Sequence, residues 1–167
     1  MELYEGGDCE PWGAYGYNLA HKHIPEMTYF SGLETAPVFM PSVGNFAQGM
    51  VVSVPLHCGR DLELAGEAGA GEAMHAALAA HYAESTFVEV MPLNEEGAKS
   101  AGLLERDAFL RPDTLNDSNN LQLFVFSNEE AGTAVLVARL DNLGKGASGA
   151  AVQNLNLALG LGETTGL

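Results

Sequence analysis

The stretch LQLFVFSNEEAGTAVLVARLDN, residues 121–142, decides the fold of this chain. It contains two apolar runs on either side of a short segment that carries the turn formers Asn128 and Gly132. Apolar runs of strand length around such a turn are the pattern of a β-hairpin. The sequence therefore predicts two neighbouring strands here, and further strands and helices on both sides of them along the chain.

Three more apolar runs, all upstream of the hairpin, have the length of strands. The run at 49–57 is continuously apolar at its start, which favours a central strand, whereas Pro55 favours a strand end or an edge. The runs at 36–41, which lies between prolines, and at 86–92 are also predicted as strands.

Helical patterns alternate with these strands and follow the hairpin. Pro25 suits the first turn of a helix and Gly32 its end. The predicted helices are 24–33, 72–85, a weak piece within 95–110, and 143–160. This order of elements predicts an α+β domain, with a mainly antiparallel sheet and helices packed on one face.

The composition fits one globular domain, 1–167, that carries a strong negative charge. Hydrophobic residues make up 47% of the 167 residues, which is enough for a core. Seven Lys and Arg residues stand against 22 Asp and Glu, for a net charge of -15. A body this acidic repels phosphate backbones and anionic lipid surfaces, so neither nucleic acid nor a membrane is expected as a partner.

Neither a secretory leader nor a membrane span is expected. The residues after Met1 lack the basic and apolar pattern of a signal peptide, and the longest apolar runs are too short to cross a bilayer. Cys9 and Cys58 are predicted to be reduced thiols of a cytoplasmic protein, and neither context is that of a catalytic cysteine.

The segment NLAHKHIPEM, residues 18–27, gathers titratable side chains in a chain that is poor in positive charge. His21 and His23 are two residues apart, so their rings share one side of an extended segment. Three interpretations follow from the residues alone: a zinc site that needs a third ligand, two ordinary surface histidines, or acid–base chemistry with Lys22 holding an anion.

The segment DNLGKGASGAAVQN, residues 141–154, leads from the hairpin into the last predicted helix. Asp141, Asn142 and Lys145 lie where the strand gives way to small residues. Such a helix start can receive an anion or a carboxamide, and it is equally consistent with an ordinary turn and a capping residue.

Both segments, with two others, resemble one family. AHKHIPE (20–26) carries a His-x-His-x-Pro-Glu pattern, AYGYN (14–18) precedes it, and FMPSVGNFAQGM (39–50) and the last 28 residues, LDNLGKGASGAAVQNLNLALGLGETTGL, follow in order. These motifs resemble the C-terminal part of N-acetyl-gamma-glutamyl-phosphate reductase, an NADP-dependent enzyme of arginine biosynthesis. They are spread from Tyr15 to Leu167, and the middle of the chain matches only in pattern.

The resemblance implies a C-terminal domain like that of glyceraldehyde-3-phosphate dehydrogenase. In the family, an N-terminal Rossmann domain carries the NADP loop and the nucleophilic cysteine, and neither motif is present in this chain. The expected reaction is reduction of N-acetylglutamyl phosphate by NADPH, through a cysteine thioester, to N-acetylglutamate semialdehyde. This domain alone is expected to be inactive and to form a homodimer or homotetramer. The alternative is a non-catalytic binding or oligomerisation module on the same scaffold.

The resemblance also implies roles for particular residues, and no metal site. His21 and His23 match the two active-site histidines of the family, without an indication of which one activates the thiol. The expected substrate-binding residues are Tyr15, Lys22 and Gln48, and the expected cofactor-binding residues are Asn142 and Lys145. Gln48 is a departure, since many relatives have arginine there, and glutamine supplies hydrogen bonds without a charge.

Overall fold

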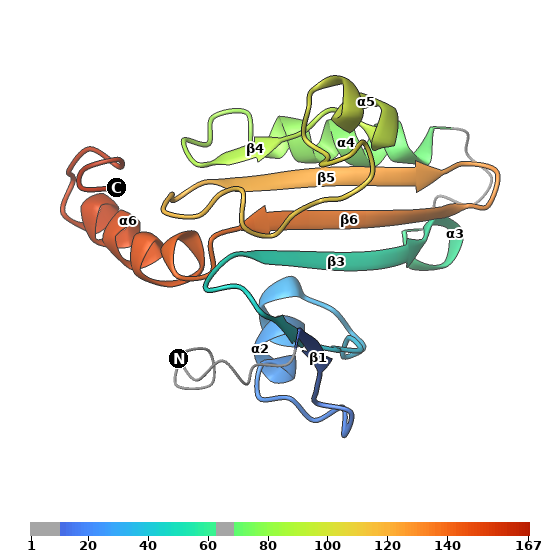
Figure 1. The fold of residues 1–167 in the computed structure, drawn as a ribbon, viewed down its shortest axis with the longest axis horizontal. Helices are drawn as coiled ribbons and strands as arrows, with labels where there is room; N and C mark the ends of the chain where they lie inside the picture. The colour runs from blue at the N-terminus through green and yellow to red at the C-terminus, as the bar shows by residue number, and fades with distance from the viewer. Residues whose placement is uncertain (1–10, 63–68) are drawn as a thin grey trace. The chain divides into compact units, whose positions relative to one another are not determined.

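The computed structural model describes residues 11–62 and 69–167, and Cys9 lies outside them. The chain divides into two compact units, Met1–Ala47 and Gln48–Leu167 (Figure 1). Each unit is described by itself below.

The first unit is small, and its described residues, 11–47, form one helix and a two-stranded sheet. Strand β1 (Trp12–Ala14) pairs antiparallel with β2 (Ser42–Gly44), and helix α2 (Ile24–Ser31) lies between them in the chain. The predicted helix at 24–33 is confirmed, with Gly32 in the left-handed conformation as its C-cap.

The predicted strand at 36–41 is wrong, because these residues are irregular and the strand begins at Ser42. Pro37 and Pro41 have no N–H to donate to a strand partner. The carbonyl of Pro41 still accepts a hydrogen bond from the N–H of Tyr15, at 3.0 Å. The end of the irregular segment therefore lies beside the residue that follows β1.

The second unit is built on a four-stranded sheet in the order β3-β6-β5-β4. The predicted hairpin is confirmed as β5 (Leu121–Asn128) and β6 (Thr133–Leu140), with antiparallel β3 (Met50–His57) on one side. Strand β4 (Val88–Val90) runs parallel to β5 on the other side. The mainly antiparallel α+β fold is therefore confirmed. The expectation that β3 is central is wrong, and the edge position indicated by Pro55 is the correct one.

Both faces of the central hairpin are covered, by different parts of the chain. Val125 packs with Met74 of helix α4 (Ala70–His81) on one face. The neighbouring Phe124 packs on the other face, against the coil that contains Leu103 and Leu110. This arrangement follows from the alternation of side chains along a strand. Helix α4 and that coil can be followed in Figure 1.

Three further α-helices are present in the described part of the second unit, and glycines in the last one and in the turn before it allow a close approach to the segment before β5. They are α3 (Cys58–Asp61), α5 (Asn94–Ser100) and α6 (Gly149–Ala158), the last preceded by the π-helical turn η1 (Gly144–Ser148). A Cβ at Gly144 would lie 2.5 Å from the carbonyl oxygen of Ser118, and one at Gly149 would lie 2.3 Å from Oδ1 of Asn119. The small residues of the predicted helix at 143–160 therefore allow it to approach the segment before β5.

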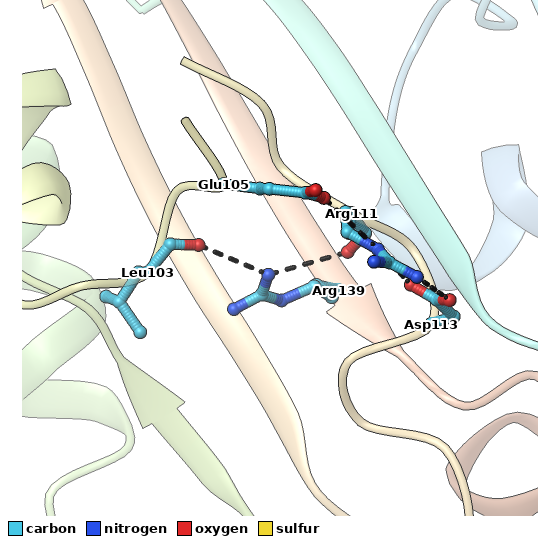
Figure 2. A network of polar contacts seen from close by, with 5 residues as sticks. All are labelled: Leu103, Glu105, Arg111, Asp113 and Arg139. Atoms are coloured by element: carbon cyan, nitrogen blue, oxygen red, sulfur yellow. Dashed lines mark hydrogen bonds and ion pairs between the residues drawn. The ribbon is translucent and has the colours of Figure 1, made fainter. Parts of the chain in front are cut away.

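A buried arginine holds the coil on the second face of the sheet. Arg139 of β6 is 3% exposed, and its guanidinium donates to Gln122 and, at 3.5 and 3.4 Å, to the carbonyl oxygens of Leu103 and Arg111. Figure 2 shows these two carbonyls converging on Arg139, while the side chain of Arg111 turns away to pair with carboxylates. Burial lowers the pKa of Arg139. The acceptors of its hydrogen bonds are neutral oxygens, so they supply no negative charge to offset this effect.

Within the described ranges, no helix is both long and apolar enough to cross a bilayer.

Candidate functional site

The predicted histidines lie close together in the first unit, with Tyr15 beside them. The ring centroids of His21 and His23 are 5.0 Å apart, and those of His21 and Tyr15 are 6.2 Å apart. Phe39 packs edge-on against His21, with a centroid distance of 5.0 Å. Lys22, between the histidines, is exposed. The first unit therefore groups four of the predicted site residues.

The two histidines differ in their hydrogen bonds. Nδ1 of His23 lies 2.8 Å from a carboxylate oxygen of Glu26. Nδ1 of His21 lies 3.3 Å from the backbone nitrogen of His23. A carboxylate only accepts, so Nδ1 of His23 carries a proton, whereas a backbone N–H only donates, so Nδ1 of His21 carries a lone pair. In the neutral rings, Nε2 of His23 is then an acceptor and Nε2 of His21 is a donor.

The His23–Glu26 pair follows from the local fold. His23 is the N-cap of α2 and Glu26 lies in the first turn of that helix. Residues three apart on a helix face the same side, so the carboxylate reaches the ring directly. Glu26 was not predicted as a site residue, although the His-x-x-Glu spacing at a helix start is a signal that sequence reasoning can use.

Gln48, predicted to bind substrate, is held by two carboxylates of the second unit. Its Nε2 donates to Oδ1 of Asp117 at 3.0 Å and to Oδ2 of Asp141 at 3.1 Å. Both amide hydrogens are therefore engaged, and an anion can take one only if such a bond opens. An arginine at this position would place a cation between these carboxylates.

Asp141 is the centre of this arrangement. Its side chain is 1% exposed, and its carboxylate accepts the backbone N–H groups of Asp117 and Leu143, each at 2.8 Å. Burial alone would raise the pKa of Asp141, but hydrogen bonds from Leu143, Asp117 and Gly144 outweigh it and leave the pKa below its ordinary value. The carboxylate of Asp141 thus joins the end of β6 to the backbone of Asp117 and to the side chain of Gln48.

Asn142 and Lys145, predicted to approach the cofactor, have separate partners in the second unit. Oδ1 of Asn142 accepts the N–H of Gly49 at 2.7 Å. Nζ of Lys145 donates to Gln153 at 2.6 Å and lies 5.5 Å from the ring centre of Phe87. Burial lowers the pKa of Lys145, and the charge of Glu163 opposes this shift.

A cavity of about 450 Å³ lies along β4, but it does not coincide with the predicted site. It is lined by residues of α4, β4 and the start of β5, and Phe87 is the lining residue that contacts Lys145. None of the predicted site residues lines it. We therefore locate the candidate chemistry at the histidines rather than at this cavity.

Thiol and metal chemistry find little support in the described part of the chain. Cys58 is 3% exposed and packs in the core with Met74 and Val125, so it is not accessible to a substrate. No group of three His, Cys, Asp or Glu side chains in residues 11–62 and 69–167 is arranged to hold a metal ion.

Comparison with known proteins gives one family. The family model described as semialdehyde dehydrogenase, dimerisation domain, matches residues 8–142. N-acetyl-gamma-glutamyl-phosphate reductase 2 of Nostoc sp. is 48% identical over 157 residues, which are 94% of this chain and 46% of the relative. The reductase of Burkholderia lata is 43% identical over 166 residues, 98% of this chain and 49% of the relative. That of Rhizobium leguminosarum bv. trifolii is 50% identical over 149 residues, 89% and 44%. The chain thus spans about half the length of these curated relatives.

Proposed function

Because the chain belongs to the family of semialdehyde dehydrogenase dimerisation domains, we propose that it is the substrate-binding and catalytic half of an N-acetyl-gamma-glutamyl-phosphate reductase. The names of its relatives support this substrate and reaction. The observation that carries a catalytic role is the 2.8 Å contact between Nδ1 of His23 and Glu26, next to His21. A carboxylate that orients a histidine is the usual device for making the far nitrogen a base.

His23 is the base for the nucleophile in this proposal. A cysteine of the half that this chain lacks gives its thiol proton to Nε2 of His23, and the thiolate attacks the acyl phosphate carbonyl. Glu26 stabilises the imidazolium that forms. Phosphate leaves, and the acyl group remains as a thioester.

His21 has a different task, because its Nε2 carries a proton. This N–H donates to the carbonyl oxygen as negative charge develops on it, first when the thiolate attacks and again when the thioester is reduced. The edge-on contact with Phe39 and the hydrogen bond from His23 hold the ring in place for this. The two histidines are therefore not interchangeable.

Asn142 and Lys145 of the second unit fit a nicotinamide dinucleotide in their donor chemistry. Since Oδ1 of Asn142 is engaged by Gly49, this residue offers its Nδ2 hydrogens to a carbonyl such as a carboxamide, and Lys145 offers a cation to a phosphate. When bound, NADPH supplies the hydride that converts the thioester to the semialdehyde. We propose that these two residues support the cofactor from this half.

Local positive charge has to attract the substrate, because the chain carries a net charge of -15. Lys22 is exposed between the two histidines, and Tyr15 lies beside His21. We propose that Lys22 and Tyr15 contact the anionic substrate. The carboxylate-bound amide of Gln48 contributes hydrogen bonding to the loop instead of charge.

An assay of the full-length protein that contains this chain tests the proposal. With N-acetylglutamate semialdehyde, phosphate and NADP⁺, we expect formation of NADPH that depends on all three, and none from the 167-residue chain alone. Turnover by the chain alone would show that the nucleophile is within it. An inactive full-length protein that still binds NADP would favour the non-catalytic module.

We also propose that the chain self-associates through the part of the sheet that α4 leaves uncovered. A groove of about 150 Å³ there has an almost entirely apolar lining, and Val52 and Val54 of β3 are each more than a third exposed. Apolar side chains of this kind on a sheet face are typical of an obligate interface. The family description, a dimerisation domain, supports a second copy as the occupant.

A charge in this groove is expected to dissociate the homo-oligomer. Val54→Glu places a carboxylate in the apolar interface, and we expect at least about a hundredfold weaker self-association in sedimentation velocity. Glu89→Gln on the opposite edge strand is the control and should leave the sedimentation coefficient unchanged. An undiminished oligomer with Val54→Glu would place the interface elsewhere.

A further inference from the structure

We propose that the outward face of α2 is the docking surface for the half of the reductase that this chain does not contain. The surface consists of Tyr29 and Phe30, together with the His23–Glu26 pair. The inference rests on the proposed function and adds a specific interface to it.

The aromatic residues of α2 face solvent, whereas those of a helix in a self-contained domain normally face the core. Tyr29 is 80% exposed and Phe30 is 83% exposed, and none of the residues of α2 is buried. The partly covered positions are Ile24, Met27 and Thr28. Amphipathic helices normally turn their largest apolar side chains inward. Two neighbouring aromatic rings at this exposure therefore indicate an absent partner.

The aromatic pair and the histidine–carboxylate pair share one side of the helix. Glu26 lies three residues after His23, and Phe30 lies four residues after Glu26, which is the spacing of one helix face. Tyr29 is three residues after Glu26 and packs edge-on against Phe30, with ring centroids 5.1 Å apart. A surface that covers Phe30 and Tyr29 consequently reaches over Glu26 and His23.

The missing half is the occupant that fits this surface. The chain covers 46% of the Nostoc relative. In a protein of that length, more than half of the residues lie outside the part that matches this chain and are available to dock on it. The side chains of His23 and Glu26 are 50% and 65% exposed, and the thiol of Cys58 is buried in the core of the second unit. Among the described residues, no accessible thiol is therefore present, and in the proposed function the nucleophile comes from the missing half.

Docking through the aromatic pair would also change the environment of the chemistry. Interface centres exclude water, and aromatic side chains are enriched there. With Tyr29 and Phe30 covered, the contact between His23 and Glu26 is removed from solvent. Charge-assisted hydrogen bonds are stronger in such a water-excluded environment than in water. The same contact would therefore bring the thiol to His23 and exclude water from the His23–Glu26 pair.

Photocrosslinking in the full-length protein tests this inference without using enzyme activity. Tyr29→p-benzoylphenylalanine is irradiated and the crosslinked peptides are identified by mass spectrometry. We expect crosslinks within one polypeptide to residues outside the 167 described by this sequence. Phe109→p-benzoylphenylalanine is the control, because Phe109 is an exposed aromatic residue of the second unit, at 55%.

The other outcomes overturn the proposal. Crosslinks from position 29 to a second copy of this sequence would make the surface a self-association site, and crosslinks to residues 48–167 would make it internal. A yield at position 29 no higher than at position 109 would leave the surface open to solvent. The reductase assay is independent of these results, so an active enzyme without the predicted crosslinks would refute only the docking surface.

Hydroxyl-radical footprinting of the unmodified full-length protein gives a second measurement. Covering Tyr29 and Phe30 at an interface centre would lower their exposed area, and hence their reactivity, severalfold. Phe109 should keep its reactivity and become more reactive than Phe30, although Phe109 is less exposed than Phe30 in this chain. A reactivity of Phe30 above that of Phe109 would contradict the inference.

Discussion

Replacing His23 by alanine in the full-length reductase is expected to lower kcat by about 10²-fold or more, the usual size of an acid–base contribution. The reason is that, in the proposed mechanism, Nε2 of His23 removes the thiol proton while Glu26 holds Nδ1 at 2.8 Å. Substrate binding relies on other groups, so KM should change much less than kcat. Steady-state kinetics in the semialdehyde direction measure both.

Two further variants separate orientation from proton transfer. Glu26→Gln keeps a hydrogen-bonding side chain but removes the negative charge that stabilises the imidazolium, so kcat should fall by about tenfold or more, with His23 still present. His21→Ala should lower kcat by about 10²-fold through loss of the Nε2–H donor. His81→Ala, an exposed histidine on α4, is the matched control. Normal kcat in both His21→Ala and His23→Ala would refute the assignment of the site.

Asp141→Asn is expected to lower the free energy of unfolding by about 2–4 kcal/mol, because it disturbs a buried, hydrogen-bonded carboxylate. The carboxylate accepts from Gln48 and from the backbone of Asp117 and Leu143, and an amide offers only one acceptor atom in the same space. Urea unfolding at pH 7 measures the loss. Asp107→Asn, on an exposed turn, should stay within about 0.5 kcal/mol of the wild type.

The same variant makes a prediction about pH. The pKa of Asp141 is lower in the folded protein than its ordinary value of 3.8, so its ionised form favours the folded state. This stabilisation is fully present above pH 3.8 and is lost as the pH falls through the folded pKa. The difference in stability between wild type and Asp141→Asn should therefore narrow below about pH 4. A difference that stays constant down to pH 2 would mean that charge is not the cause.

The sheet could be predicted from the sequence because its signals are local. The two apolar runs around Asn128 and Gly132 specify the hairpin, and Pro55 specifies an edge. The parallel pairing of β4 with β5 could not be read in the same way, because it joins residues separated by α5 and a long coil. The strand expected at 36–41 is not formed, because Pro37 and Pro41 have no N–H to donate to a neighbouring strand.

The site could be predicted only in part, and for a physical reason. The proximity of the two histidines could be predicted because they lie two residues apart, and the same reasoning at helical spacing could have added Glu26. The clamp formed by Asp117 and Asp141 around Gln48 joins residues 69 and 93 positions apart, so it depends on tertiary structure. Likewise, the partnership of Lys145 with Phe87 links two distant segments, and composition gives no sign of it.

Pro55 on the free edge of the sheet has a consequence for how copies of this protein assemble. Strand β3 keeps its register with β6 across this position, Pro55 opposite Val135, so the N–H that proline lacks is one that would have faced outward. An incoming strand would find a gap in its ladder there, and growth of the sheet from copy to copy is discouraged. Copies that meet on the apolar face of the sheet instead bury it between them, and a self-complementary contact of this kind closes with two-fold symmetry. Pro55 thereby favours a finite assembly over an open filament.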